Sequence, residues 1–557
     1  MINYIKIRDD NVNTIDIKYG NLLNSFEKGT TYYEICKYFD VLNKALAVNV
    51  DNQLHHLSEK VFDSCNINII TVHDVLGNKI YKNGILFIFE SALKNIYSDI
   101  EVSFEHSVPT GVLAKISNNY SFQEEDVNKV KNEMNRLIHE DIMIKKLTIL
   151  KEEAIDYYKH SGYFEKGFNI QNISDKVVSI YSMLGRHNYF YTLLPYSTGI
   201  INKFNVKLLD SHRLIVLTPN LSGELTLYTN CDNIINSFYK GKCLLEDLDV
   251  NYLCDINKKV CTNEINKFIK SCELVFNLSL AQAAKKITDN KNIKFILIAG
   301  PSSSGKTTTC RRLADYLNAS GYDTIRLSID DYYVDRDLSP KDENGNYDFE
   351  CLEVIDVEGF NIDLNNLLKG ESVRERKYNF ITGKKEYTDK FIKLENNSII
   401  LIEGLHALNN KLTPTIDDKY KFKIYLSPFI PLNIDRHNYI STIDLRLLRR
   451  IIRDNRTRGY KVENTIESWQ RVRNGEEKYI FPYIPDADII INTALAYEVG
   501  ALKVFAEPLL YSVDINDEYY EEARRLLNFL KPFYMIPGEY IPEDSILREF
   551  IGGRYND

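Results

Sequence analysis

A nine-residue loop that directly follows an apolar run places the strongest constraint on the fold of this chain. Residues 300–308 read Gly-Pro-Ser-Ser-Ser-Gly-Lys-Thr-Thr, and the segment 293–299 before them is mostly apolar and β-branched. The loop fits the pattern G-x-x-x-x-G-K-[ST], whose backbone N–H groups wrap a nucleoside triphosphate. Residues 310–318 read as the helix whose N-terminus faces the phosphates. Strand, loop and helix in this order predict a triphosphate-binding α/β domain.

The loop pattern also assigns roles to single residues. Lys306 is expected to reach the outer phosphates, and the hydroxyl of Thr307 is expected to hold Mg²⁺. The backbone N–H groups of the loop are expected to cradle the triphosphate. The predicted nucleotide-binding residues are Gly300, Ser302, Ser303, Ser304, Gly305, Lys306, Thr307 and Thr308.

Two strands downstream of the loop are expected to end in carboxylates. In the segment 327–333, Asp330 and Asp331 follow the first of these strands. A carboxylate at the carboxyl end of a strand beside the loop can take a proton from an acceptor hydroxyl; the alternative is a turn with solvated aspartates. The run 399–404 is closed by Glu403, which suits a ligand of Mg²⁺-bound water, and an ordinary strand terminus is the alternative here.

A run of arginines follows in a helical segment that breaks at Gly459. One interpretation is a solvated helix face or a weak RNA-binding patch. The other is a lid whose guanidinium groups close over the transferring phosphoryl group and neutralise its charge. The arginines are Arg446, Arg449, Arg450, Arg453, Arg456 and Arg458. A further strand, expected over 486–492, is interpreted as structural.

In this order and spacing, these motifs resemble the uridine kinase and phosphoribulokinase family, and uridine–cytidine kinases most closely, from about residue 293 to 500. The resemblance implies an ATP- and Mg²⁺-dependent kinase that phosphorylates the 5′-hydroxyl of a ribonucleoside, by default uridine or cytidine. It implies Asp330 as the catalytic base, with Asp331 as the less favoured alternative, and Glu403 as support for the metal. It also implies a lid formed by Arg450, Arg453 and Arg458. The implied substrate-binding residues are Asp330, Tyr333, Glu350, Tyr378 and Arg450.

The sequence departs from this family around the acceptor. Glu350 stands where the family has an aspartate for the ribose diol, and Gly383 stands where a histidine helps to read a pyrimidine. Tyr460 replaces the second arginine of the lid's Arg-Gly-Arg. A purine nucleoside or a sugar phosphate therefore remains an alternative acceptor.

An insertion over 427–442 precedes the arginine run and carries Arg436, His437 and Asn438. Two interpretations are open: it builds part of the acceptor pocket, or it is a surface loop.

The first residues of the chain are predicted to form a small β-grasp-like module, with strands over 3–7, 13–18, 45–50 and 66–70 and a helix over 32–38. The segments at 45–54 and 66–71 resemble the ubiquitin-like TGS module of threonyl-tRNA synthetases. The residues after them, with a helix expected over 124–150, resemble the editing-type domain of those enzymes.

The segment that resembles the editing-type domain lacks the His and Cys side chains that carry out the chemistry in that family. The His-x-x-x-His and Cys-x-x-x-His pairs of that family align with Asn83, Phe87, Leu194 and Thr198, so an aminoacyl-hydrolysing site is not expected. His55 and His56 are adjacent and indicate an exposed turn. His106 either lines a pocket or is a hydrogen-bonded structural residue, and the second interpretation is favoured.

We therefore predict an α/β protein in which a P-loop kinase domain with a parallel sheet follows a β-grasp-like module and an α+β synthetase-like domain. The expected divisions are 1–75, 76–225, a helical connector over 226–290, the kinase domain over 291–500 and a helical extension over 501–557.

Composition narrows the class of protein. No apolar stretch reaches the length of a membrane span, and nine cysteines without paired spacing indicate a reducing, cytoplasmic location. The formal net charge of −9 disfavours nucleic acid, yet RNA binding by the amino-terminal half stays open, as does a homo-oligomer. The rival to a nucleoside kinase is a nucleotide-gated RNA-binding or regulatory protein.

Overall fold

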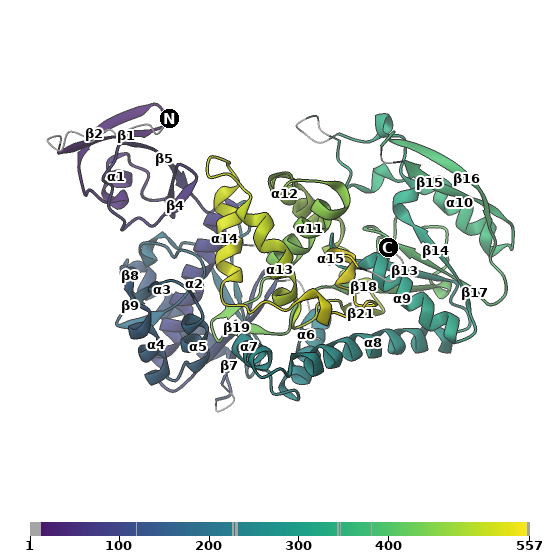
Figure 1. Cartoon of the computed structure of the whole chain (residues 1–557), viewed down its shortest axis with the longest axis horizontal. Coiled ribbons are helices and arrows are strands. Elements are labelled where there is room, and N and C mark those ends of the chain that lie inside the picture. The colour runs from purple at the N-terminus through teal and green to yellow at the C-terminus, as the bar shows by residue number, and fades with distance from the viewer. Residues whose placement is uncertain are drawn as a thin grey trace.

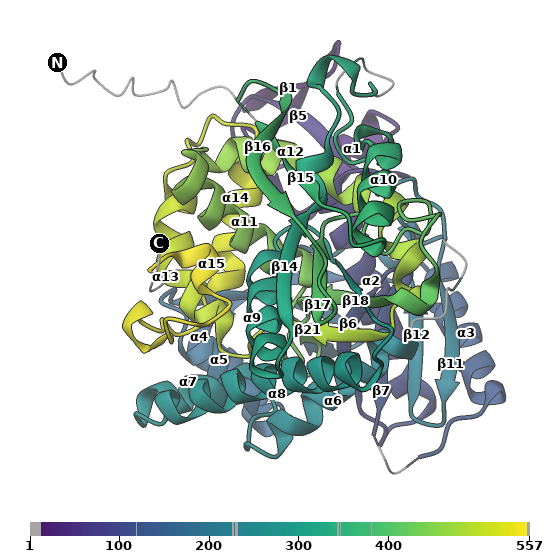
Figure 2. The ribbon, with the colours of Figure 1, turned by 90° about the vertical axis from the view of Figure 1, so that its right-hand side faces the viewer.

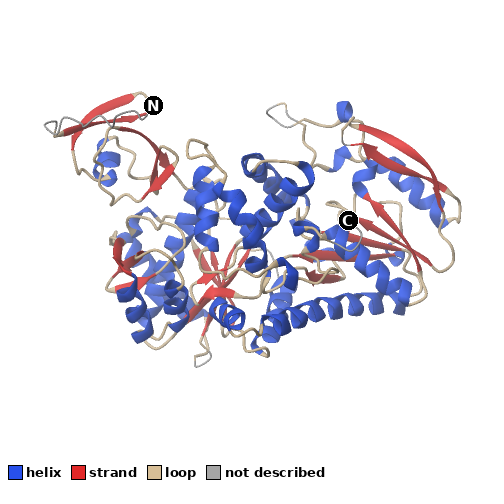
Figure 3. Cartoon of the chain, viewed as in Figure 1, coloured by secondary structure: helices blue, strands red, loops and turns tan. Residues whose placement is uncertain are grey.

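The computed structural model describes residues 13–117, 120–225, 228, 232–341, 345, 347–379 and 381–553. Its amino-terminal half and its parallel-sheet domain lie at opposite ends of the long axis, and the last helices of the chain lie between them (Figure 1). Strands gather in separate groups in the two halves, each covered by helices (Figure 3). The strand expected over 3–7 lies outside the described residues.

The first module is a five-stranded sheet in the order β2-β1-β5-β3-β4, covered by one helix. Strands β1 and β5 are parallel and the other neighbours are antiparallel, as in a β-grasp. Alternate residues of β1, Ile15 and Ile17, are buried against the helix. The elements are β1 (Thr14–Tyr19), β2 (Leu22–Glu27), α1 (Tyr32–Tyr38), β3 (Ala47–Val50), β4 (Gln53–His55) and β5 (Cys65–Ile70).

The exposed turn expected at the paired histidines is wrong. His56 is fully buried, and its Nδ1 lies 2.7 Å from the hydroxyl of Ser58. Its neighbour His55 ends β4 and contacts Glu59. Burial lowers the pKa of His56 to about 4, so a neutral ring packs beneath the module.

The second module combines a four-stranded sheet, β11-β12-β7-β6, with a three-stranded sheet, β10-β9-β8. Its elements are α2 (Val75–Ile96), β6 (Val102–Val108), β7 (Gly111–Ile116), α3 (Glu124–His139), β8 (Lys145–Leu150), α4 (Lys151–His160), α5 (Phe164–Gln171), β9 (Val177–Met183), β10 (Arg186–Asn188), β11 (Asn205–Asp210) and β12 (Arg213–Leu217). The single helix predicted over 124–150 is wrong beyond His139. The chain turns at Asp141, which has a positive φ of 48°, and residues 145–150 pair with β9 instead.

Three helices connect the halves, as predicted: α6 (Asp232–Glu246), α7 (Leu253–Cys261) and α8 (Ile265–Asp289). The long helix α8 runs beneath the parallel-sheet domain and packs against the first helix of that domain, α9 (Figure 2). Within the described part of the chain, no helix is both long and apolar enough to cross a membrane.

The parallel-sheet domain, in the carboxyl-terminal half, is built on a five-stranded sheet in the order β14-β17-β13-β18-β21, in which all neighbours are parallel. The strands are β13 (Phe295–Ala299), β14 (Asp323–Ser328), β17 (Ser398–Glu403), β18 (Lys421–Ser427) and β21 (Ile489–Asn492), with the hairpins β15 (Val373–Asn379)–β16 (Lys384–Ile392) and β19 (Asn433–Asp435)–β20 (Asn438–Tyr439) outside the sheet. The helices are α9 (Lys306–Ala319), α10 (Val357–Leu368), α11 (Thr442–Arg458), α12 (Val462–Tyr479), α13 (Glu498–Tyr511), α14 (Tyr520–Leu530) and α15 (Arg548–Ile551).

Both faces of this sheet are buried. On β13, Ile296 and Ile298 face the helices α8 and α9, whereas Phe295 and Leu297 belong to the core shared with α6 and α10. The central strands β13 and β17 meet water on neither face, so they are nearly continuous apolar runs and not alternating ones. The predicted α/β class is confirmed.

The insertion before the arginines is buried where the two halves meet, so the surface-loop interpretation is wrong, and its part in an acceptor pocket stays a prediction. The backbone N–H of Phe104 donates to the carbonyl of Arg436 (3.0 Å), and the Asn433 amide donates to the carbonyl of Phe104 (2.7 Å). Lys166 and Asp435, each 1% exposed, lie 3.6 Å apart across the same junction. The favoured structural interpretation of His106 agrees with its burial and its stacking on Phe238.

A buried ion pair fixes α14 against α11. Arg525 donates two hydrogen bonds to the carboxylate of Asp444, at 2.7 and 3.0 Å, and both side chains are less than a tenth exposed. The pKa of Asp444 is lowered because the attraction of Arg525 and Lys79 outweighs burial. The pair therefore ties α14 to the first turn of the arginine-rich helix α11.

Breaking this pair by Arg525→Met should lower the free energy of unfolding by about 3–5 kcal/mol, because Asp444 would keep a buried charge with one partner fewer. The matched control is Arg524→Met, which removes an exposed neighbour and should change stability by less than about 0.5 kcal/mol. Chemical denaturation of the full chain measures both. Equal stability of the two variants would contradict the role of the pair.

Candidate functional site

The phosphate loop lies between β13 and α9 in the conformation that anion binding requires. Gly305 has a φ of 84° and precedes the first residue of α9, which begins at Lys306. A Cβ atom on Gly305 would lie 2.5 Å from the side chain of Ile546, so the position needs glycine on both counts. The ammonium of Lys306 donates to the carbonyls of Gly300 (3.0 Å) and Pro301 (3.2 Å) and thus lies across the loop. The strand, loop and helix predicted from the sequence are confirmed.

Two buried arginines hold this loop from behind. Arg446 Nε donates to the carbonyl of Ser302 (2.9 Å), and Arg449 Nη1 donates to the carbonyl of Ser303 (3.1 Å). Each guanidinium is paired with a buried glutamate, Glu476 on α12 for Arg446 and Glu498 on α13 for Arg449. These two arginines are neither a solvated face nor free lid residues.

The three arginines predicted for the lid share one buried carboxylate. Arg450, Arg453 and Arg458 lie 3.2, 2.8 and 3.4 Å from the oxygens of Asp454, which is 1% exposed. Arg450 also donates to the hydroxyl of Ser302 (3.1 Å). The predicted lid therefore contacts the loop through Arg450, and Asp454 forms ion pairs with all three of its arginines. No sequence pattern assigned a role to Asp454.

A hydroxyl and a carboxylate suited to Mg²⁺ lie at the outer end of the loop. Thr307 Oγ1 is 3.3 Å from Glu403 Oε1, at the carboxyl end of β17. Burial raises the pKa of Glu403 to about 7, and the Lys306 ammonium opposes that rise. Two hard oxygen ligands at this spacing fit Mg²⁺, which completes its shell with water and phosphate oxygens. Among the residues that the structure describes, no cluster of three or more His, Cys, Asp or Glu side chains forms a separate metal site.

The two candidate aspartates have different partners. Asp331 is bound by the Lys377 ammonium (2.7 Å) and by the backbone N–H of Tyr378 (3.4 Å). Asp330 instead faces Lys306, and its pKa is raised by burial, an effect that Lys306 and the Tyr333 hydroxyl oppose. A buried carboxylate near Lys306 that forms no ion pair with the described residues can accept a proton.

Glu350 lies on the same side of the site as Asp330. Burial, followed by repulsion from Glu476, raises its pKa to about 7, and Arg450 and Lys306 oppose this. The backbone carbonyl of Glu350 lies 3.0 Å from His406 Nε2, a contact that no sequence pattern indicated. The carboxylate of Glu350 is buried close enough to Arg450 and Lys306 to interact with their charges.

The remaining acceptor-side residues cluster less tightly. The rings of Tyr333 and Tyr378 meet edge to face with their centroids 5.5 Å apart. Gly383 has a φ of 68°, and a Cβ there would lie 2.8 Å from the Arg336 side chain. The backbone conformation and Arg336 together disfavour a larger side chain at Gly383, the position where the family resemblance implies a histidine.

A residue from the end of the chain reaches the phosphate loop. Glu549 on α15 accepts hydrogen bonds from the hydroxyl of Thr308 (2.5 Å) and from its backbone N–H (3.2 Å). The guanidinium carbon of Arg449 lies over the ring of Phe550, 4.7 Å from the centroid of that ring. Since 241 residues separate Thr308 from Glu549, no local pattern could have indicated this contact.

The positions that align with synthetase ligands are occupied by structural contacts. Phe87 and Leu194 are buried in the core of the second module. The Asn83 amide donates to the hydroxyl of Thr192 (2.6 Å), and the Thr198 hydroxyl donates to the carbonyl of Leu137 (2.6 Å). In the structure, two of these side chains pack in the core and two form hydrogen bonds within the module.

Comparisons with known proteins match the two halves separately. Residues 295–499 match the family described as "Phosphoribulokinase / Uridine kinase family". A uridine kinase of Macrococcus caseolyticus is 30% identical over 212 residues, which cover 37% of this chain and 93% of that protein. A uridine kinase of Halobacterium salinarum is 29% identical over 196 residues, which cover 35% of this chain and 77% of that protein.

The amino-terminal part is similar to a threonine–tRNA ligase of Caldanaerobacter subterraneus, at 29% identity over 136 residues. The match covers 24% of this chain and 21% of that ligase, so this chain spans only about a fifth of the ligase's length. The phosphate loop, the acidic strand ends and the arginine helix all fall inside the other matched segment, 295–499. The chain therefore belongs to the phosphoribulokinase and uridine kinase family, as a phosphotransferase with an alcohol acceptor that also carries a synthetase-like amino-terminal part.

Proposed function

We propose that the protein is an ATP- and Mg²⁺-dependent nucleoside kinase that transfers the γ-phosphoryl group to the 5′-hydroxyl of a ribonucleoside, with uridine or cytidine as the default acceptor. The observation that carries the proposal is the position of Asp330, which faces Lys306 while its neighbour Asp331 is held by Lys377. A protein that only binds a nucleotide as a switch needs no hydroxyl-orienting acid and no arginine lid. The named function of the uridine kinase relatives supports the same class of acceptor.

In this proposal, the residues of the chain divide the work of in-line transfer. The loop amides and Lys306 bind the triphosphate, and Asp330 orients the acceptor hydroxyl and takes its proton. Bound Mg²⁺, held through Thr307 and Glu403, would neutralise phosphate charge. Arg450, Arg453 and Arg458 exchange part of their contact with Asp454 for the phosphoryl oxygens and exclude water.

Glu350 and Arg450 are proposed to hold the acceptor. Their mutual attraction appears in the pKa of Glu350, which Arg450 lowers against the effect of burial. A glutamate has a longer side chain than the aspartate of relatives, and Gly383 offers no side chain to read a base. A screen of acceptor-dependent ADP release with uridine, cytidine, adenosine, guanosine and ribulose 5-phosphate tests the proposal. Release with ribulose 5-phosphate alone, or with none of them, would contradict it, and tRNA binding that depends on ATP would then favour the regulatory alternative.

Replacing the proposed base by Asp330→Asn should lower kcat at least about 100-fold, because the amide cannot accept the hydroxyl proton. The dissociation constant for ATP should stay within about threefold, since Asp330 does not bind the donor in this proposal. Asp331→Asn is the matched control and should keep most of the turnover, because it removes only the contact with Lys377. Steady-state kinetics with direct ATP titration separates the two effects. An Asp330→Asn enzyme with most of its turnover would remove Asp330 from this role.

Replacing Glu350 by glutamine should raise KM for the acceptor about tenfold or more, because a hydrogen bond to a charged group contributes about 1.5–3 kcal/mol. KM for ATP should change by less than about twofold. Glu353→Gln is the control, since Glu353 is exposed three residues away. Initial rates measured with each substrate varied in turn distinguish these outcomes; a selective rise in KM for ATP would place Glu350 on the donor side instead.

Glu549 should oppose triphosphate binding, because its carboxylate occupies N–H and O–H donors at the start of α9 that can also bind phosphate oxygens. Glu549→Gln should tighten ATP binding about fivefold or more, which corresponds to the loss of about 1 kcal/mol of charge repulsion. Glu543→Gln changes an exposed residue of the same tail and should have no effect. Calorimetric titration with a non-hydrolysable ATP analogue measures both. Weaker binding by Glu549→Gln would show that Glu549 stabilises the nucleotide-binding conformation.

A further inference from the structure

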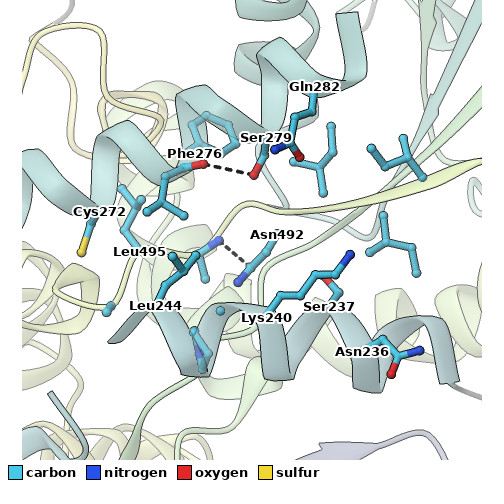
Figure 4. Close-up of a pocket in the computed structure, with 18 of the residues that line it drawn as sticks. Asn236, Ser237, Lys240, Leu244, Cys272, Phe276, Ser279, Gln282, Asn492 and Leu495 are labelled. Carbon is cyan, nitrogen blue, oxygen red and sulfur yellow. Dashed lines mark hydrogen bonds between the residues drawn. The ribbon is translucent and has the colours of Figure 1, made fainter. Parts of the chain in front are cut away.

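A cavity of about 420 Å³ lies where the synthetase-like module meets the arginine-rich helix α11 and the helix α14. Its walls come from α2, α11, α12 and α14 and from the insertion, so neither half forms it alone. A second cavity of similar volume lies between α6, α8 and the edge strand β21 (Figure 4). The polar side of that second cavity consists of exposed residues such as Lys240 and Gln282, which are ordinary for a solvated rim.

Charges in the interdomain cavity are almost all paired. The pairs that line it are Lys79 with Asp444 (3.0 Å), Arg525 with Glu522 (2.7 Å) and Arg473 with Glu477 (2.9 Å). Each of these cations therefore already has a carboxylate. The exception is Lys82, on α2, which forms no hydrogen bond or ion pair with any residue that the structure describes.

The surroundings of Lys82 make its charge costly. Burial, followed by repulsion from Arg473 and Lys79, lowers the pKa of Lys82 to about 8, and the carboxylates of Asp444 and Glu477 oppose this only in part. A cation that is partly buried beside like charges is normally compensated by a nearby anion. Among the described residues, no carboxylate lies within ion-pair distance of Lys82, which points to an anion from outside the chain.

Neutral polar groups beside Lys82 could bind the rest of such a ligand. Asn83 and Thr192 lie on the same wall, joined by a 2.6 Å hydrogen bond. Trp469, on α12, is 7% exposed, and its indole N–H has no acceptor among the described residues. An apolar ring with an unused donor is a common lining for a small-molecule site at a domain interface.

We propose that this interdomain cavity is a binding site for a small organic anion that carries one carboxylate or phosphate group, with Lys82 as its ion-pair partner. One unpaired cation matches one anionic group. The volume lies in the range of pockets that enclose small metabolites, about 300–1,000 Å³. This site is separate from the phosphate loop, and its existence does not depend on the acceptor that the kinase uses.

The chain offers a specific probe for the test, because Trp469 is its single tryptophan and lines the cavity. Benzoate and phenyl phosphate serve as the carboxylate and phosphate probes, and benzamide serves as the uncharged control. The titrations use full-length protein with Lys306→Ala, so that anion binding to the phosphate loop is weakened. We expect saturable quenching or enhancement of tryptophan fluorescence by at least one anion and none by benzamide, and the tighter anion identifies the group.

Adding Lys82→Gln should weaken binding of that anion at least about tenfold, as loss of one charged contact of about 1.4 kcal/mol predicts. Lys82→Arg should retain binding, and Lys240→Gln, in the second cavity, should leave it unchanged. Without probe, Lys82→Gln should have an equal or higher thermal midpoint, because it removes an uncompensated charge. The proposal is overturned if neither anion binds saturably, if benzamide binds as tightly, if Lys82→Gln binds equally well, or if its midpoint falls and so marks Lys82 as a structural residue.

Discussion

The grip of two buried arginines on the phosphate loop is the interaction on which the rest of this structure depends. Arg446 and Arg449 each pair with a glutamate, and all four side chains are at most 2% exposed. Removing one partner of such a pair would leave an uncompensated charge in the core, which costs several kcal/mol. The same guanidinium groups donate to the carbonyls of Ser302 and Ser303 and so fix the backbone of the loop.

This bracing connects elements that are distant in sequence. Glu476 lies on α12 and also accepts the backbone N–H of Ser302 at 2.9 Å, so one carboxylate holds both the loop and its arginine. On α12, the indole of Trp469 lies near Arg446 on one side and lines the interdomain cavity on the other. Trp469 and Arg446 therefore connect the cavity to the loop by side-chain contacts. The carboxyl-terminal tail contacts the loop residue Thr308 through Glu549, and it contacts Arg449 through Phe550.

Much of the kinase site could be predicted because its chemistry is local. A glycine-rich loop must follow a strand and begin a helix, and acids at the ends of parallel strands meet at one edge of the sheet. Asp330 and Glu403 thus lie near Lys306 as expected. The arginine run was harder to interpret, since helical spacing cannot tell which residues face a core that other segments supply. Arg446 and Arg449 face inward because Glu476 and Glu498 lie there. Residues 145–150 were assigned to a helix because their strand partner, β9, comes some thirty residues later.

The sequence by itself determined the parallel-sheet kinase domain, the phosphate loop and the acidic residues that face it, because each depends on neighbours along the chain. Only the tertiary structure decided that the insertion is a buried junction, that Asp454 gathers the lid arginines, and that Glu549 reaches the loop from the end of the chain. The physical reason is that burial and ion pairing depend on which charges meet in space. Thr308 and Glu549 are 241 positions apart, and the chain between them carries no local signal of that contact.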